Sequence, residues 1–147
     1  GDGELRNSLR SYAAELGLEH HIIFMGWVED LVETYADLDI VALTSLNEGT
    51  PVSMIEAMAA ARAAIATNVG GVKDLIEDGM TGLLVNPSDI DDFCAKLDAL
   101  IRDQKMRSEL GINARRAVVA KYAKDRLVRD VESLYEELLR KNSKPNV

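Results

Sequence analysis

Short apolar runs rich in β-branched residues alternate along this chain with segments whose apolar residues recur every three or four positions. The runs predict strands at residues 21–25, 39–44, 63–67 and 81–85. The periodic segments predict helices at residues 5–16, 31–36, 51–61, 72–77 and 89–103, then two more up to Lys141, divided near Tyr122. Strands joined through helices pair in parallel. The pattern therefore predicts an α/β fold, a Rossmann-like parallel sheet of about four strands with helices on both faces and a helical C-terminus.

The composition narrows the class of protein. The 147 residues include 17 basic and 25 acidic side chains, and the net charge of −8 argues against a nucleic-acid-binding surface. No apolar run approaches the roughly 20 residues that a membrane-spanning helix needs, so we expect no integral membrane segment. The single Cys94 excludes an internal disulfide and fits a reducing compartment, so we expect a cytoplasmic location. Cys94 lies beside Phe93 and Leu97, and we expect it to be buried.

Ligands of such sheets bind beyond the carboxyl ends of the strands, and the loop at residues 45–51 is the most informative of the loops there. Thr50 is a predicted N-cap, and Pro51 would occupy the first helical position. The backbone amides of Val52 and Ser53 would then point, without partners, into the mouth of the loop. Free amides at a helix start favour an anion such as a phosphate.

Two carboxylates, Glu48 and Glu56, flank this predicted anion site. Carboxylates repel phosphate, so their own partners must be hydrogen-bond donors, of which sugar hydroxyls are the obvious choice. A phosphate at the helix start between two polyols describes a nucleoside diphosphate sugar. On spacing alone, the alternative is that Glu48 is an ordinary loop carboxylate and Glu56 a solvated helix residue.

The segment from Glu48 to Glu56 resembles the signature of family 4 glycosyltransferases, retaining enzymes of the GT-B fold, in which two glutamates are separated by seven residues. Other segments resemble the same family in the same order, at residues 22–28, 35–45, 66–76 and 78–85. The resemblance implies an N-terminally truncated C-terminal nucleotide-sugar-binding domain. Residues 1–141 would form this partial Rossmann-like donor-binding domain, and residues 142–147 a frayed tail.

The resemblance also implies roles for individual residues. Glu48 would contact the donor sugar as the candidate catalytic residue, without acting as a covalent nucleophile, and Glu56 would hold the ribose. The backbone around the sugar and phosphates would be that of Gly49, Thr50, Pro51, Val52 and Ser53. The base would lie against Trp27, Val28 and Asp30.

Departures from the family shape further expectations. Its C-terminal domain normally begins two strands earlier, with a glycine-rich loop and an arginine and a lysine that neutralise the diphosphate, and an N-terminal domain binds the acceptor. We therefore expect this chain to bind the donor weakly and to be inactive by itself. Ala61 stands where the family commonly has glycine, which would cost about 1 kcal/mol if that position has positive φ.

The expected partners are the nucleotide-sugar donor and the missing N-terminal domain. Because the two upstream strands normally separate the first predicted strand from the second, either these two pair directly or another chain fills the gap. A homo-oligomer is therefore expected, through the exposed sheet edge or the C-terminal helices. An apolar stripe on those helices is predicted to pack in the core, with an orphaned domain interface as the alternative, at Tyr122, Leu127, Val131, Leu134, Tyr135 and Leu138.

No metal or other cofactor is expected. Asp37-Leu38-Asp39 spells the Asp-x-Asp of metal-dependent glycosyltransferases of another fold, but it precedes a predicted strand and is interpreted as a helix-to-strand turn. Peripheral attachment of the full-length enzyme to a membrane stays open beside the cytoplasmic location.

Two other functions compete with donor binding. One is a non-catalytic Rossmann-like binding or interaction module. The other is a complete small enzyme of another α/β type, such as a phosphate-transfer domain, although the sequence lacks a phosphate loop and a nucleophile elbow. The presence of both Glu48 and Glu56 favours donor binding, since a pure scaffold needs neither.

Overall fold

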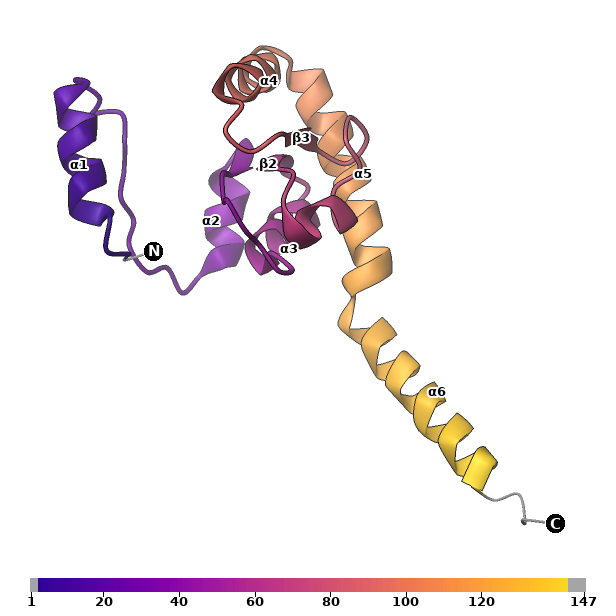
Figure 1. The fold of residues 1–147 in the computed structure, drawn as a ribbon. Helices are drawn as coiled ribbons and strands as arrows, with labels where there is room; N and C mark the ends of the chain where they lie inside the picture. Colours follow the sequence, from indigo (N-terminus) through magenta and orange to yellow (C-terminus); the bar gives the residue numbers. More distant parts are fainter. Residues whose placement is uncertain (1–2, 143–147) are drawn as a thin grey trace. The chain divides into compact units, whose positions relative to one another are not determined.

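The computed structural model describes residues 3–142, within two compact units, Gly1–Thr34 and Tyr35–Val147, here called the N-terminal and C-terminal units (Figure 1). The N-terminal unit contains helix α1 (Arg6–Glu15) and the first residues of α2 (Leu31–Asp37). The C-terminal unit contains the sheet and all later helices. Each unit is described separately below.

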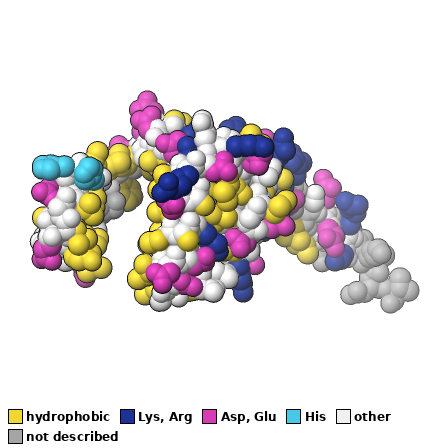
Figure 2. Space-filling model, turned by 90° about the horizontal axis from the view of Figure 1, so that it is seen from above, with side chains coloured by type: hydrophobic (Ala, Val, Ile, Leu, Met, Phe, Trp, Pro, Cys, Tyr) yellow, Lys and Arg dark blue, Asp and Glu magenta, His cyan; other side chains and the backbone are white. Residues whose placement is uncertain are grey.

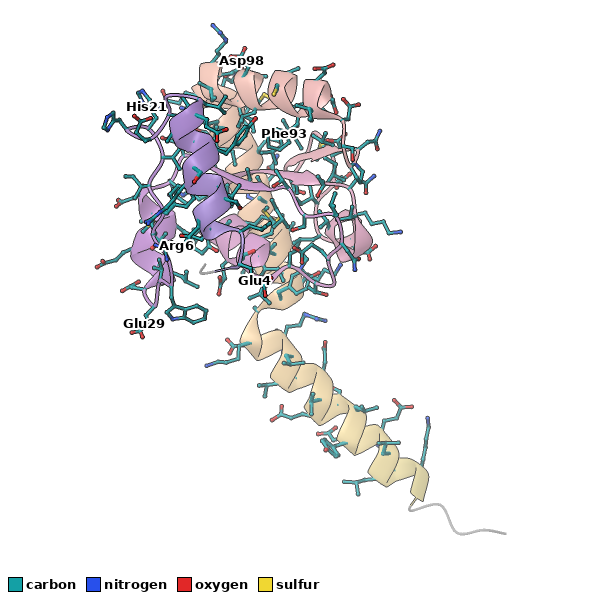
Figure 3. All side chains as sticks on the ribbon, turned by 60° about the vertical axis from the view of Figure 1, so that its left-hand side comes forward. Glu4, Arg6, His21, Glu29, Phe93 and Asp98 are labelled. Carbon is teal, nitrogen blue, oxygen red and sulfur yellow. The ribbon has the colours of Figure 1, made fainter. Side chains whose placement is uncertain are left out.

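Helix α1 ends as the sequence predicts. Gly17 has a φ of +68°, and the amides of Gly17 and Leu18 donate to carbonyls of the last helical turn. Two arginines of α1 hold the returning chain: Arg6 donates to the Phe24 carbonyl at 3.3 Å, and the Arg10 guanidinium lies 5.4 Å from the centroid of the Phe24 ring. Figure 3 labels Arg6, together with Glu4, His21 and Glu29 of the same unit.

The predicted strand at residues 21–25 is wrong. His21 lies in a turn, and residues 22–26 form irregular chain. A strand needs the N–H and C=O groups of a neighbouring strand, and the described part of the N-terminal unit contains none. In the part of the chain that the structure describes, the sheet therefore has three strands, and the predicted direct pairing of the first two strands does not occur.

The sheet of the C-terminal unit is parallel throughout, with the order β1-β2-β3. Its strands are β1 (Ile40–Leu43), β2 (Ala63–Thr67) and β3 (Leu83–Val85), with Ile40 opposite Ala63 and Thr67 opposite Val85. Strand β2 is buried along its whole length because it lies between two strands and under helices on both faces. The predicted fold class is thus confirmed.

The two faces of β2 belong to two hydrophobic clusters, as a period of two requires. Ala64 and Ala66 pack with α3 (Val52–Ala59), the short 3₁₀ helix η1 (Gly70–Asp74) and the second half of α5 (Gln104–Tyr122). Ala63 and Ile65 pack with α4 (Ile90–Arg102) and the first half of α5. In Figure 1, α4 lies above the strands and α3 below them.

Helix α5 reaches both clusters because it approaches the end of α3 closely. A Cβ at Gly111 would overlap the carbonyl oxygen of Ala61, so only glycine fits at this crossing. Ala61 itself has a φ of +57°, which confirms the suspected left-handed conformation at a position occupied by alanine.

Two predicted helix caps lie one residue from the observed ones. Pro51, not Thr50, is the N-cap of α3, so Val52 is the first helical residue. Asp89, not Ser88, caps α4, and its carboxylate accepts the Asp92 amide at 3.0 Å. In both places two adjacent residues suit a helix start, and Ser88 is instead held at a φ of +69°.

Cys94 is exposed, so its predicted burial is wrong. Phe93 and Leu97 face the core cluster from α4, and Cys94 points away because one residue turns a helix by about 100°. Figure 3 shows Phe93 on the side of α4 toward the strands and Asp98 on the outer side.

Helix α6 (Lys124–Asn142) follows α5 after a break at Ala123, as predicted near Tyr122. Tyr122 packs against the core, but the rest of the predicted stripe is exposed, so its assignment to the core is wrong. The exposed members are Leu127, Val131, Leu134, Tyr135 and Leu138. Asn142 is the last residue of α6, and the rest of the predicted frayed tail, residues 143–147, lies outside the described residues.

The surface mixes all kinds of side chain. On the face drawn in Figure 2, acidic and basic side chains are interspersed, with hydrophobic ones exposed between them. Among the described residues, none of the helices combines the length and apolar character needed to cross a bilayer.

Candidate functional site

The loop that follows β1 is held from below by the loop that follows β2. The Gly71 amide donates to the carbonyl oxygens of Glu48 and Gly49, at 3.3 and 3.1 Å. A Cβ at Gly70 would overlap the Glu48 carbonyl, and one at Gly71 would overlap the Gly49 carbonyl. Gly70 also has a φ of +47°. Two glycines in a row therefore let the second loop support the first at the carboxyl edge of the sheet.

Glu48 is half-buried, and its carboxylate is held by a neighbour that the sequence analysis did not single out. The Ser45 hydroxyl donates to Glu48 Oε1 at 2.6 Å. The buried Thr67 hydroxyl, at the end of β2, donates to the Ser45 carbonyl at 2.5 Å. These two bonds connect the Glu48 carboxylate to the central strand. One Glu48 oxygen and the remaining lone pairs stay available to a ligand donor.

Helix α3 starts directly after this loop. Pro51 is buried, and its carbonyl accepts the amides of Met54 and Ile55, at 3.1 and 3.2 Å. The side chains of Val52 and Ser53 are exposed, and among the described residues their amides have no hydrogen-bond partner. This confirms the predicted pair of unpartnered amides at the start of the helix, although the cap differs. Such amides, with the helix dipole behind them, favour a negative charge.

Glu56 lies on α3, one turn beyond these amides, and is half-buried. The Tyr35 hydroxyl lies 3.0 Å from the Ser53 carbonyl and 3.4 Å from Glu56 Oε2, so its single proton is shared between two acceptors on the same helix. Burial raises the pKa of Tyr35, and the negative charge of Glu56 and the hydrogen bond to it act in the same direction.

The predicted base-contacting residues belong to the N-terminal unit. Trp27 is 79% exposed, and Val28 is half-buried. The Asp30 carboxylate accepts the amides of Val32 and Glu33, both at 3.1 Å, and so caps the start of α2. The structure brings together the predicted residues from Glu48 to Glu56. Contact of Trp27, Val28 and Asp30 with a base stays a prediction.

Basic side chains do not balance the two glutamates in the geometry described. Arg62 donates to the carbonyls of Leu38 and Ala60, at 2.9 and 3.0 Å, which places it at the amino ends of β1 and β2, opposite the candidate site. Within residues 3–142, no three His, Cys, Asp or Glu side chains gather as a metal site would need.

A cavity of about 240 Å³ opens at the same carboxyl edge, beyond all three strands. Its walls are mostly apolar, and it was not anticipated from the sequence. The residues that line it include Thr44, Leu46, Thr67, Val85, Asn86 and Phe93. Thr67 thus lies between this cavity and the Ser45–Glu48 pair.

The sequence offered only partial signals for the supporting residues. Ser45 comes three residues before Glu48, and Tyr35 begins the run of residues 35–45 that leads into the signature. Neither position reveals a contact, because Thr67 and Tyr35 reach the site only through the pairing of β1 with β2 and the packing of α3. The fold and this site define an α/β domain with a ligand-binding edge at the carboxyl ends of its strands.

The chain belongs to the family of group 1 glycosyl transferases, which its residues 1–117 match. It is 30% identical over 142 residues to the UDP-Gal:α-D-GlcNAc-diphosphoundecaprenol α-1,3-galactosyltransferase of Escherichia coli, covering 95% of this chain and 36% of the relative. It is 29% identical to the N-acetyl-α-D-glucosaminyl L-malate synthase of Bacillus anthracis, covering 98% and 38%. The chain thus spans little more than a third of the length of these relatives.

Solved structures resemble the chain as closely. Sucrose-phosphate synthase of Thermosynechococcus elongatus matches with a TM-score of 0.86 and 26% identity, covering 96% of this chain and 36% of the other. A C-terminal domain of a group 1 glycosyl transferase from Francisella tularensis matches with a TM-score of 0.71 and 36% identity, covering 81% and 63%. TarM of Staphylococcus aureus, solved with UDP, has a TM-score of 0.83 and 27% identity, covering 92% and 28%. These neighbours agree with a GT-B C-terminal domain.

Proposed function

We propose that this chain is the donor-binding part of a retaining, family 4 glycosyltransferase and binds a nucleoside diphosphate sugar beside α3. The observation that carries the proposal is the placement of Glu48 and Glu56 on either side of the unpartnered amides of Val52 and Ser53. Amides suit a diphosphate, and carboxylates suit hydroxyls. A ligand that presents hydroxyls on both sides of a diphosphate matches this order of groups.

In this proposal Glu48 accepts hydroxyls of the sugar, as the candidate catalytic residue, and Glu56 accepts the ribose hydroxyls. The backbone from Gly49 to Ser53 lines the sugar and phosphates, and Trp27, Val28 and Asp30 contact the base. The UDP in the TarM structure and the UDP-sugar in the name of the Escherichia coli relative support a uridine nucleotide as the first donor to test.

The acceptor would bind to a separate N-terminal domain of the whole enzyme, because the relatives are nearly three times as long as this chain. We therefore propose that this chain alone does not transfer sugar. A homo-oligomer through the free edge of β1 or through α6, a cytoplasmic location and a peripheral membrane association of the whole enzyme stay predictions.

The test is a titration of the chain with UDP and GDP, followed by backbone amide chemical shifts. We expect shifts at Val52, Ser53 and Glu56 for one of the two nucleotides. Glu56→Gln should weaken binding, whereas the matched change Glu132→Gln, on an exposed part of α6, should not. If Val52, Ser53 and Glu56 do not respond to either nucleotide, the chain is better described as a non-catalytic interaction module.

A further inference from the structure

Each of the two glutamates is hydrogen-bonded to a hydroxyl that lies outside the segment between them. Ser45 donates to Glu48 at 2.6 Å, and the Tyr35 hydroxyl lies 3.4 Å from Glu56 Oε2. Neither hydroxyl belongs to the segment for which a ligand contact is proposed. Their roles are therefore a question separate from ligand binding itself.

The bond to Glu48 begins in the core of the sheet. Thr67 is 6% exposed and is paired with Val85 in the ladder between β2 and β3, so its position is fixed by both neighbours. Its hydroxyl fixes the Ser45 carbonyl, and the Ser45 hydroxyl fixes one oxygen of Glu48. A hydroxyl bonded to a carboxylate forms a charge-assisted bond, which is stronger than a bond between neutral groups. The rotamer of Glu48 is thereby tied to the sheet.

The bond to Glu56 begins in the hydrophobic cluster on the other side of α3. Tyr35 is 8% exposed and packs in the cluster that contains Met54, Ala57 and Met58 of α3. Its hydroxyl contacts α3 at both the Ser53 carbonyl and the Glu56 carboxylate. The rigid ring therefore acts on the first turn of the helix as well as on the glutamate.

We propose that Ser45 and Tyr35 are positioning residues that hold Glu48 and Glu56 in the orientation needed for the hydroxyls of a nucleoside diphosphate sugar, an inference that rests on the proposed function. Ser45 sets the carboxylate that accepts from the sugar, and Tyr35 sets the carboxylate that accepts from the ribose. Neither residue touches the ligand. Each glutamate keeps free lone pairs for the ligand while one is occupied from behind.

The two roles predict different ligand dependence, which a purely structural role would not. Ser45→Ala should weaken UDP-glucose by about fivefold and leave UDP unchanged, because UDP lacks the sugar that Glu48 would hold. Tyr35→Phe should weaken UDP and UDP-glucose equally, by about threefold, because both carry the ribose. With 2′-deoxy-UDP as the probe, Tyr35→Phe should lose most of its effect. Calorimetric Kd values for the full chain measure each difference, with GDP and GDP-mannose run in parallel.

Controls separate this inference from the proposed function. Glu48→Ala and Glu56→Ala must themselves weaken the nucleotides; if they do not, the proposed function fails and the inference falls with it. If they do, while Ser45→Ala and Tyr35→Phe bind every probe normally, the positioning role alone is wrong. Adding Ser45→Ala to Glu48→Ala should cause no further loss, since Ser45 acts only through Glu48. A further, additive loss would contradict that mechanism.

The hydroxyl itself is tested by a matched pair. Ser45→Thr keeps a hydroxyl and should restore most of the UDP-glucose affinity, whereas Ser45→Val has nearly the same shape and should not. Urea unfolding of each variant shows that it is folded, and this pair replaces Ser45→Ala if that variant does not fold. Equal affinity of the Thr and Val variants for UDP-glucose would overturn the role assigned to Ser45.

Discussion

The carbonyl oxygen of Ala61 lies in the space that a side chain at Gly111 would occupy. Ala61 turns the chain from α3 into β2 with a φ of +57°, and this turn directs its carbonyl toward α5. Helix α5 can approach only because position 111 has no Cβ. The turn and the helix crossing therefore depend on each other, and both halves can be tested separately.

Replacing Ala61 with glycine should stabilise the chain. Alanine in the left-handed region costs about 1–2 kcal/mol, and the greater freedom of glycine in the unfolded chain offsets part of that gain. We expect a net increase of about 0.5–1 kcal/mol in the free energy of unfolding, measured by urea denaturation. Ala60 has an ordinary φ of −78°, so the matched change Ala60→Gly should destabilise instead. Destabilisation by both changes would contradict strain at Ala61.

Replacing Gly111 with alanine should destabilise the chain by about 2 kcal/mol or more, because a new methyl group would meet backbone, which cannot move aside easily. The same urea unfolding measurement applies. At Gly49 a Cβ would meet nothing within 4 Å, so Gly49→Ala is the control and should leave stability within about 0.5 kcal/mol. Equal effects at the two glycines would mean that α5 does not rely on this close approach.

Stability should fall at alkaline pH because of Tyr35. Burial, followed by the charge of Glu56 and the hydrogen bond to it, raises the pKa of Tyr35 above its ordinary value of 10.0. As the pH rises past about 10, the unfolded chain releases this proton while the folded chain keeps it, so the free energy of unfolding decreases up to the folded pKa. Urea unfolding at about pH 9 and about pH 11 should show a larger loss for the wild type than for Tyr35→Phe. Parallel losses in the two proteins would rule out this contribution.

The cap of α4 distinguishes the structure from the sequence prediction. Asp89→Ala removes the acceptor for the Asp92 amide and should cost about 1 kcal/mol of stability. Ser88→Ala should cost less than about 0.5 kcal/mol, because Ser88 makes no capping bond among the described residues. Thermal unfolding of the two variants decides between the positions. A larger loss at Ser88 would favour the predicted cap.

Patterns that a local stretch of sequence determines were predicted well. The stop of α1 at Gly17, the buried β2 and the division between α5 and α6 follow from glycine, apolar runs and helical periodicity. The location of Glu48 and Glu56 beside the start of α3 followed from the rule that sites lie at the carboxyl ends of parallel strands.

Features that depend on distant partners were missed. Residues 22–26 have the composition of a strand but pair with no strand in the described part of the chain, and composition does not reveal a partner. The stripe on α6 has the period of a buried helix, yet no described element covers it. The bonds from Thr67 to Ser45 and from Tyr35 to Glu56 join residues 22 and 21 positions apart, and only the folded chain brings them together.

The support of the Glu48–Gly49 backbone by Gly71 has a thermodynamic consequence. Because these bonds form when the chain folds, the conformational entropy of this loop is lost during folding and not when a ligand arrives. A ligand that this edge of the sheet accepts therefore meets a surface that is already ordered. Its association should proceed at a rate set by diffusion and orientation, and the heat-capacity change on binding should reflect only the surface buried by the ligand.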